Sequence, residues 1–476
     1  MGKLVNMKYL DSNTLDIIRQ DLDQREELIR KAVYEALFQL DKPDLSESIV
    51  ASYFICARNL SPAQVGKEIC YHMTSGVRKA EAGSLLEQCT GKVVDSVCFD
   101  KEQRCGLVRV AFPLKMLLDE TGNIFSTDIL HIAAGAGVFA LRENKDAKLV
   151  DIAMSDKILA KFPGPAYGAA GLRKLTNFGN RVAFGTILKP CTGITPQQEA
   201  ELVYEAAKCP LFMFIKEDEN FMPGVSFAPV AERAKYALKS LERAKKYRDG
   251  AGIIFATHVT SPPHLIKDYV KRTLDAGVNG LMFSEYYCGG AVRMVREMTK
   301  SMDCPPVIYG HNGGIDTHTR HIYREVLDMF ARLDGIDIRQ TAPVTAGMNL
   351  LRPYGLEWRK CEEMLSKPLG NKPAVMISRA GGLDQGNIIT NLLDVSKGMG
   401  VFNYLFLAGS AINGIKDSKG NYDPRIGAEA MKQALGVFEE NVFTNPSEVC
   451  PANLKAYADS HGLKAFSCAL AQRYNI

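Results

Sequence analysis

The 476-residue chain lacks several features that would assign it to common classes of protein. No apolar run approaches the ~20 residues needed to span a bilayer, so we expect no membrane partner. Its 58 basic and 54 acidic residues leave a net charge of only +4, which is too small to predict binding to nucleic acid. The twelve cysteines include no CxxC pair, and no secretion signal precedes them, so we expect reduced thiols in a cytoplasmic protein.

From about residue 182 onward, strand-like apolar runs alternate with helix-like segments. Eight runs occur, at residues 182–190, 211–216, 253–260, 280–286, 306–311, 335–340, 374–379 and 404–410. Segments with helical periodicity, such as 197–206 and 231–241, separate most of them. Eight near-continuous apolar strands, each followed by a helix, predict an α/β fold with a closed (β/α)8 TIM barrel.

The chain is longer than the ~250 residues typical of such a barrel, so a second domain is expected. Strand-like runs at residues 49–57, 92–100 and 105–112, with a helix-like segment at 61–72, predict an α+β domain. In chain order, the predicted organisation is a helical extension at 1–45, the α+β N-terminal domain at 46–150, the barrel at 151–440 and a helical tail at 441–476. The charged amphipathic helical stretch at residues 11–40 is expected to pack against the rest of the protein or against another subunit.

Charged residues stand where the predicted barrel strands end, which is where such barrels carry their chemistry. The second run ends at Lys216, and an acidic triplet at residues 217–219 follows at once. Clustered carboxylate oxygens suit a hard divalent cation such as Mg2+, although an ordinary polar loop is the alternative for this segment alone. Lys189 ends the first run and His311 ends the fifth. Together these ends predict a charged site on one rim.

The seventh and eighth runs end in small residues instead. Gly381 and Gly382 follow one, and Gly409 and Ser410 follow the other. Backbone N–H groups can approach an anion there, and the loops after strands seven and eight are the usual phosphate-binding positions of this fold. Tight turns that require positive φ are the alternative explanation for the glycines.

These motifs resemble those of the RuBisCO large-subunit superfamily. Residues 162–174 (FPGPAYGAAGLRK) resemble the family's entry into the barrel, and residues 185–190 (GTILKP) resemble its first strand. Residues 216–220 (KEDEN) fall on its metal-site signature. The similarity extends from about residue 50 to about residue 440, and it implies the same barrel and N-terminal domain.

The resemblance implies that Lys216 reacts with CO2 to form a carbamate, which binds Mg2+ together with Asp218 and Glu219. Lys189 matches the position that abstracts a proton during enolisation. It must be neutral to do so, and we expect burial and a nearby cation to lower its pKa. His311 matches a histidine that contacts substrate oxygens and can shuttle a proton, while a rim histidine bonded to a backbone carbonyl is the alternative.

Further contacts are implied by the same resemblance. Phosphate or substrate contacts are expected at Gly381, Gly382, Gly409, Ser410 and Asn312. Glu68 corresponds to a glutamate of the N-terminal domain, although its usual Thr-Gly follow-up is replaced by residues 72–76. Because that domain completes the neighbouring subunit's site in this superfamily, a homodimer or an oligomer of dimers is implied.

Departures from the family's pattern indicate which branch of the superfamily the chain resembles. Carboxylating members carry a lysine in the loop after strand six, but residues 341–349 (TAPVTAGMN) contain none. Gln340 stands where a histidine is expected, Asn312 where an arginine is expected and Ala380 where a serine is expected. Other replacements are Leu407 and Ala408 for two glycines and Cys191 for a frequent second lysine. The chain therefore looks like a RuBisCO-like protein of the form IV type.

The resemblance and its departures predict Mg2+-dependent enolate chemistry on a phosphorylated ketose or keto acid, with enolisation, isomerisation or decarboxylation as the outcome. One alternative is a true ribulose-1,5-bisphosphate carboxylase, and another is a non-catalytic regulatory or assembly homologue. A non-catalytic homologue would be expected to lose its metal ligands. Because the chain keeps both lysines and both carboxylates of the pattern, we favour an enzyme.

Overall fold

The computed structural model describes residues 22–345 and 354–476, and side chains from residue 25 onward. The chain divides into two compact units between residues 42 and 43. In the first unit the described helix is α2 (Leu22–Gln39), which lies within the helical stretch expected at residues 11–40. The earlier part of that stretch lies outside the described residues.

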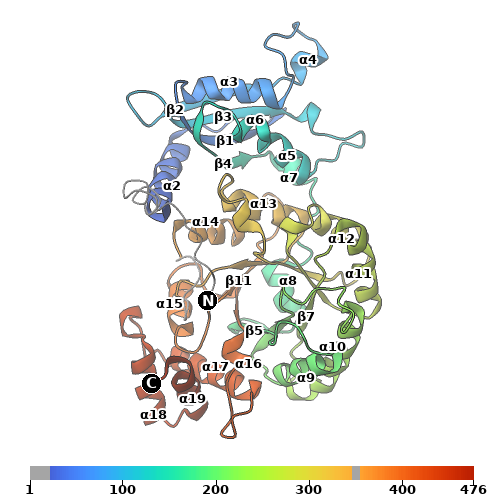
Figure 1. The fold of residues 1–476 in the computed structure, drawn as a ribbon, viewed down its shortest axis with the longest axis vertical. Coiled ribbons are helices and arrows are strands. Elements are labelled where there is room, and N and C mark those ends of the chain that lie inside the picture. Colours follow the sequence, from blue (N-terminus) through green and yellow to red (C-terminus); the bar gives the residue numbers. More distant parts are fainter. Residues whose placement is uncertain (1–21, 346–353) are drawn as a thin grey trace, which may run out of the picture. The chain divides into compact units, whose positions relative to one another are not determined.

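The second unit begins with a four-stranded antiparallel sheet in the order β2-β3-β1-β4. Its strands are β1 (Ser48–Ala57), β2 (Lys92–Cys98), β3 (Cys105–Pro113) and β4 (Asn144–Ala153). The central strand β1 is buried along most of its length, whereas the edge strand β2 alternates exposed and half-buried residues. Helix α3 (Pro62–Met73) packs on this sheet and begins with a capping box at Ser61. The expected α+β domain is therefore confirmed (Figure 1).

Strand β4 was not among the expected strands, and it ends at Ala153, beyond the boundary expected at residue 150. Its Leu149 exchanges backbone hydrogen bonds with His321 and Tyr323, which follow β9 (Val307–Gly310) of the barrel. Four short elements lie between strands of the sheet: α4 (Leu85–Gln88), η1 (Leu114–Met116), α5 (Ser126–Ala133) and α6 (Ala136–Phe139). Helix α7 (Asp156–Leu159) follows β4 and leads toward the barrel. The segment after one barrel strand is thus tied to the small sheet.

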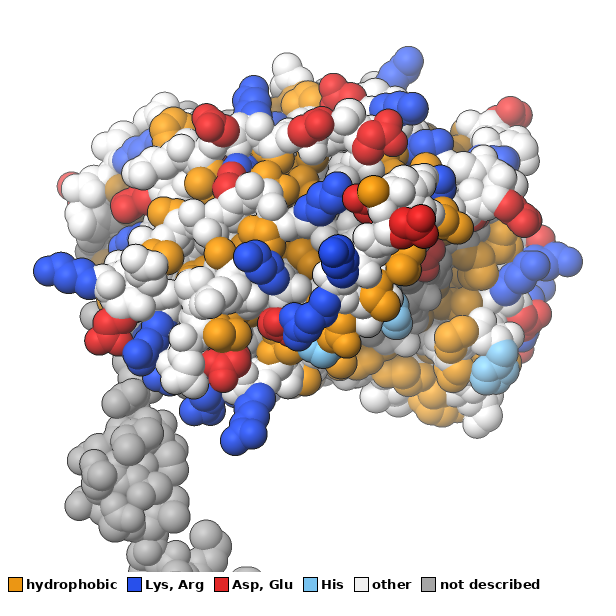
Figure 2. Space-filling model, turned by 90° about the horizontal axis from the view of Figure 1, so that it is seen from above, with side chains coloured by type: hydrophobic (Ala, Val, Ile, Leu, Met, Phe, Trp, Pro, Cys, Tyr) orange, Lys and Arg blue, Asp and Glu red, His pale blue; other side chains and the backbone are white. Residues whose placement is uncertain are grey.

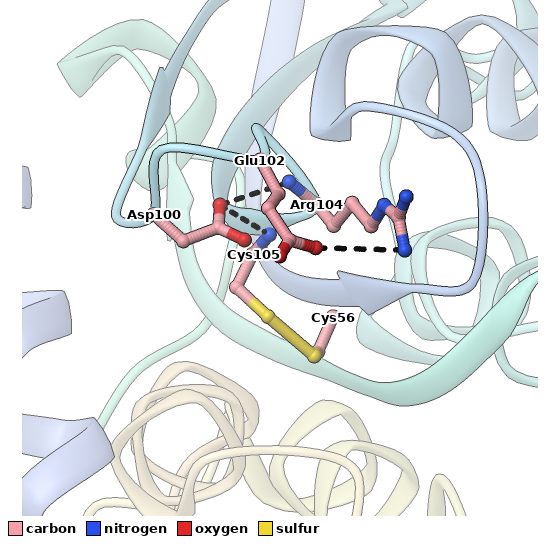
Figure 3. Close-up of a disulfide and its surroundings, with 5 residues drawn as sticks. All are labelled: Cys56, Asp100, Glu102, Arg104 and Cys105. Carbon is pink, nitrogen blue, oxygen red and sulfur yellow. Dashed lines mark hydrogen bonds and ion pairs between the residues drawn. A yellow bond between two sulfur atoms is a disulfide. The ribbon is translucent and has the colours of Figure 1, made fainter.

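One expectation about the cysteines is wrong, because Cys56 and Cys105 form a disulfide (Figure 3). They are directly opposite each other in the β1/β3 pairing, with their Cα atoms 4.2 Å apart. Asp100 accepts hydrogen bonds from the backbone N–H groups of Arg104 and Cys105, which shapes the adjoining turn. The other ten cysteines are free thiols. Spacing along the chain does not reveal a pair that only strand register brings together.

Eight parallel strands form a closed barrel, as expected. In chain order they are β5 (Ala183–Ile187), β6 (Phe212–Lys216), β7 (Ile254–His258), β8 (Gly280–Phe283), β9, β10 (Ile338–Thr341), β11 (Met376–Ala380) and β12 (Tyr404–Ala408). Each lies within or overlaps one of the eight apolar runs. Because both faces of these strands are covered, almost every strand residue is buried.

Helix α8 (Gly168–Leu175) closes one end of the barrel. Its Ala169 and Leu172 belong to the same core cluster as inward-facing strand residues such as Met213 and Tyr309. The N–H of Ala169 donates to the carbonyl of Ala374, just ahead of β11. Since α8 covers the ends where strands begin, the ends where strands finish remain for chemistry.

Helices also surround the barrel (Figure 1). They are α9 (Pro196–Ala207), α10 (Val230–Ala244), α11 (Pro263–Asp275), α12 (Ala291–Thr299), α13 (Arg324–Asp334), α14 (Leu356–Leu365), α15 (Ile388–Lys397), α16 (Ser410–Asn413) and α17 (Pro424–Glu439). Helices α18 (Pro451–Ser460) and α19 (Lys464–Tyr474) follow, and α19 packs on α17. Short 3-10 turns are η2 (Lys245–Tyr247), η3 (Glu285–Tyr287), η4 (Ile315–Thr317), η5 (Val401–Asn403) and η6 (Pro446–Glu448).

Within the described ranges, no helix has the length and apolar character required to cross a membrane. On the face shown in Figure 2, basic and acidic side chains are interspersed. This mixture agrees with the nearly balanced composition.

Candidate active site

Lys216 is the last residue of β6 and is completely buried. Its Nζ donates to the carbonyl oxygen of Glu217 at 3.2 Å, contacts Met282 Sδ at 3.3 Å and lies 5.6 Å from the centre of the Tyr309 ring. Burial lowers its pKa, although the nearby carboxylates oppose the shift. The shift is toward the neutral amine, which is the form of a lysine side chain that reacts with CO2.

Glu219 lies close to this amine and pairs with a histidine. Its Oε2 is 3.8 Å from Lys216 Nζ and 3.2 Å from His311 Nε2. His311 Nδ1 accepts the backbone N–H of Gly313, so Nε2 carries the proton that faces the carboxylate. Burial lowers the pKa of His311. Burial acts against ionisation of Glu219, but the His311 hydrogen bond and the neighbouring positive charge outweigh it and lower its pKa.

Asp218 forms an ion pair with Lys189, which lies two residues after the end of β5. Lys189 Nζ is 2.5 Å from Asp218 Oδ2, and Asn220 donates to Asp218 Oδ1 at 2.8 Å. Lys189 Nζ also lies 2.9 Å from Cys191 Sγ. The expected direction of the Lys189 pKa is wrong: burial lowers it, but hydrogen bonds from this ammonium to Asp218 and Cys191 raise it overall. With Asp218 as its partner, Lys189 is held in its charged form.

The donor set formed by Lys216, Asp218 and Glu219 fits a hard cation. Two carboxylates follow the end of one strand, and the buried amine beside them would become a third anionic oxygen donor once converted to a carbamate. Within residues 22–345 and 354–476, no cluster of three or more His, Cys, Asp or Glu side chains is arranged to hold a metal. Lysine is not among those residue types, so the third donor depends on the modification.

A buried ion pair beneath these ligands was missed by the sequence analysis. Arg233 of α10 binds both carboxylate oxygens of Glu217 at 2.9 Å, and both side chains are fully buried. The backbone N–H of His258 donates to the same carboxylate at 2.8 Å. Arg233 also donates to the carbonyl of Ala228 at 2.5 Å. Glu217 therefore anchors the segment that presents the proposed metal ligands.

The expected phosphate-binding residues follow β11 and β12. Gly381 and Gly382 have φ values of 96° and 81°, which L side chains rarely adopt. A Cβ at Gly409 would lie 3.4 Å from Cε of Lys189, so the loop after β12 reaches the lysine that ends the first loop. Ser410 is exposed beside it. The structure thus places the small-residue loops and the charged residues on one rim.

Two other expected residues have different surroundings. Asn312 follows His311, and its side-chain oxygen is buried with no hydrogen-bond partner among the described residues. Glu68 lies on α3 and forms two hydrogen bonds with Arg78, at 2.8 and 2.9 Å. The contacts recorded for Glu68 join it to Arg78 and His72, so within the described part of one chain they do not link it to the rim.

The departures also have structural roles. Gln340 of β10 accepts a hydrogen bond from the Tyr309 hydroxyl at 2.9 Å, and that hydroxyl lies 3.1 Å from Ser378 Oγ of β11. Residues 341–345 of the loop after β10 are described, whereas its residues 346–349 lie outside the described residues. Gln340 therefore takes part in neutral hydrogen bonds that join β9, β10 and β11.

The chain is similar to known proteins in sequence and in fold. Residues 168–350 match the family model described as ribulose bisphosphate carboxylase large chain, catalytic domain. A ribulose bisphosphate carboxylase of Thermococcus onnurineus is 28% identical over 363 residues, covering 71% of this chain and 75% of that protein. A 3-oxo-isoapionate-4-phosphate decarboxylase of Rhizobium rhizogenes is 29% identical over 236 residues, covering 48% and 53%. The crystal structure of a rubisco-like protein from Burkholderia fungorum shares the fold, with a TM-score of 0.71 and 21% identity over 90% of this chain and 100% of that one.

Proposed function

We propose that the chain, which is similar over residues 168–350 to the catalytic domain of the ribulose bisphosphate carboxylase large chain, is a RuBisCO-like, Mg2+-dependent enzyme that forms an enolate from a phosphorylated ketose or keto acid. Enolisation, isomerisation and decarboxylation are the outcomes we consider. A decarboxylase of a phosphorylated oxo compound among the relatives supports including the last. We also propose that it acts as a homodimer or an oligomer of dimers, in which Glu68 serves the partner's site.

One observation carries this proposal. Five residues from three strand ends form two sets of contacts on one rim. Lys189 pairs with Asp218, and the next residue, Glu219, lies close to both Lys216 and His311. In an ordinary polar loop such groups would be solvated and separate, because burying a charge is costly unless it is paired. Perturbed titratable groups gathered at the catalytic end of a barrel indicate an active site.

In the proposed reaction, the residues act in separate roles. Lys216 as a carbamate, Asp218 and Glu219 would hold Mg2+, which when bound polarises a substrate carbonyl. Lys189, once it has left Asp218 and lost its ammonium proton to solvent, would take the proton from the adjacent carbon through Nζ. His311 would contact a substrate oxygen through Nε2 and pass a proton to or from it.

Two alternatives can be separated from this proposal. A true carboxylase is supported by the carboxylase relative, yet it needs a cation to stabilise the developing carboxylate, and residues 341–349 contain no lysine. We therefore expect no fixation of labelled CO2 onto ribulose 1,5-bisphosphate, and measurable fixation would replace the proposal. A non-catalytic homologue would bind a ligand without turning it over.

The direct test is exchange of substrate C–H protons with deuterated water, followed by NMR across a panel of phosphorylated ketoses and keto acids with Mg2+ and bicarbonate. Exchange or CO2 release with one compound would support the enolate chemistry and identify the substrate. Each positive compound should be repeated without Mg2+, where we expect exchange to stop. Silence across a broad panel would count against the proposed reaction.

A further inference from the structure

The loops after β11 and β12 are joined by a cation from a distant part of the chain. Arg473 of α19 donates from Nε to Asp384 Oδ2 at 3.2 Å, just after Gly381 and Gly382. Its Nη1 lies 3.5 Å from the hydroxyl of Ser410. One guanidinium therefore bridges the two small-residue loops of the rim.

This arginine is held in a defined position. Phe466 and Leu470 of α19 are completely buried, which fixes the helix against the barrel. The next residue, Tyr474, donates its hydroxyl to Asp384 Oδ1 at 2.7 Å and lies so close to Gly386 that a Cβ there would meet its ring. The side chain of Arg473 keeps only 16% of its surface exposed.

The guanidinium retains capacity for an anion. Asp384 is almost fully buried, and it also accepts the backbone N–H of Gly386, so its oxygens are occupied. Beyond Asp384 and Ser410, no hydrogen-bond partner of Arg473 is recorded among the described residues. Its remaining N–H groups form a planar fork, which suits the oxygens of a phosphate.

We propose that Arg473 and Ser410 complete an anion-binding site between the loops after β11 and β12, where they hold the phosphate group of the substrate together with the glycine backbone. This inference rests on the proposed function, in that the substrate is a phosphate ester. It adds a binding residue from outside the barrel to the loops expected to grip phosphate. Because Gly409 adjoins Lys189, a phosphate held there would place the rest of the substrate beside the proposed base.

The test is calorimetric titration of inorganic phosphate into the full chain without Mg2+ or bicarbonate, so that it does not depend on catalysis. Losing a charge-assisted hydrogen bond should weaken phosphate binding about 10-fold in Arg473→Gln. Arg473→Lys, which keeps charge but loses the fork, should fall between that variant and the wild type. Arg425→Gln is the matched control, because Arg425 lies on α17, is exposed and pairs with Asp423 at the start of that helix.

Tyr474→Phe separates binding from packing, since it loosens the same helix end without removing charge. We expect its phosphate affinity to stay within about 2-fold of the wild type. Unchanged binding in Arg473→Gln, equal losses in Arg473→Gln and Tyr474→Phe, or no phosphate binding by the wild type would overturn the proposal. Thermal melting of each variant checks that the fold is retained, and Arg473→Lys serves if the glutamine variant does not fold.

A second titration asks which source of phosphate the site accepts. Ribulose 5-phosphate should bind more tightly than inorganic phosphate, and its binding should show the same dependence on Arg473. Binding of the free ion alone would overturn the assignment to a substrate group. A protein that passes these titrations but shows no proton exchange would keep the anion site and lose the proposed chemistry.

Discussion

The two halves of the barrel rim are built in opposite ways. After β5, β6 and β9, charged side chains contact one another directly, as in the Lys189–Asp218 and His311–Glu219 pairs. After β11 and β12 the strands end in small residues, and the charge comes from Arg473 on a helix outside the barrel. The first half supplies the groups that the proposed proton and metal chemistry needs, whereas the second offers a backbone surface that other segments complete.

This difference bears on which properties of the site can change independently. The charged half depends on side chains that contact one another, so a substitution there affects more than one residue. The small-residue half depends on loop shape and on a distant helix, so its ligand can change while the chemistry stays. Retained chemistry with an altered binding half is what the residue departures at Gln340, Ala380, Leu407 and Ala408 suggest.

The largest effect is expected from Lys189→Met. Without the amine, proton exchange in the identified substrate should fall about 1,000-fold, which is within the usual range for loss of a general base. Mg2+ binding should be retained, because the Lys189 ammonium otherwise occupies Asp218. Lys271→Met on α11 is an exposed control with the same change. Exchange within 10-fold of the wild type would remove Lys189 from the base role.

Lys216→Ala should abolish the effect of bicarbonate on Mg2+ affinity. The wild type should bind Mg2+ more tightly with bicarbonate than without it. The Mg2+ affinity of the variant should fall by at least roughly 10- to 100-fold, which is the loss typical when a residue that supports a metal ligand is removed. Calorimetric titration with and without bicarbonate measures this, with Lys235→Ala on the exposed side of α10 as the control. A bicarbonate effect that survives in Lys216→Ala would contradict the ligand assignment, and circular dichroism shows whether the fold is intact.

Much of the charged half could be predicted from the sequence, because its residues lie at the ends of recognisable strands. Once the eight apolar runs are identified, Lys189, Lys216 and His311 must face one rim. The direction of the Lys189 pKa could not be predicted, since it depends on which carboxylate the side chain meets. Pairs such as Glu217 with Arg233 arise from helix packing, which periodicity alone does not resolve.

The contacts of the small-residue half could not be predicted from the sequence, for a different reason. Arg473 lies 89 residues beyond its partner Asp384, in a tail for which the sequence predicts only helices. Cys56 and Cys105 are likewise 49 residues apart and meet only through the β1/β3 register. Strand β4, with the mixed sequence NKDAKLVDIA, shows no clean alternation. Long-range contacts and weakly patterned strands are therefore what the structure adds.

Glu217→Gln tests whether the charged half depends on its buried anchor. The change leaves the Arg233 charge buried with a poorer partner, because Glu199 lies farther away, at 3.6 Å. Unfolding in denaturant should show a loss of about 3 kcal/mol in stability. Glu201→Gln is the matched control, because the ion pair of Glu201 with Arg243 is more than half exposed. We expect this substitution to lower the free energy of unfolding by no more than about 0.5 kcal/mol. Equal effects of the two substitutions would refute the anchoring role of Glu217.

The smallest effect is expected where the two halves meet. Tyr309 of β9 donates to Gln340 of β10 and contacts Ser378 of β11, and burial raises its pKa so that the hydroxyl stays protonated. Tyr309→Phe should cost about 1 kcal/mol in the free energy of unfolding, through the lost hydrogen bond and the unsatisfied amide. Tyr422→Phe, at an exposed tyrosine, is the control and should change stability little.

The same variant decides whether the halves are separable. If Tyr309 only supports the barrel interior, then Mg2+ affinity in the presence of bicarbonate should match that of the wild type. If Mg2+ affinity falls by 10-fold or more, then the ring beside Lys216 transmits changes from the altered strands to the proposed metal ligands. In that case the binding half and the chemical half cannot vary independently, and residues such as Gln340 would have to be counted among those that tune the metal site.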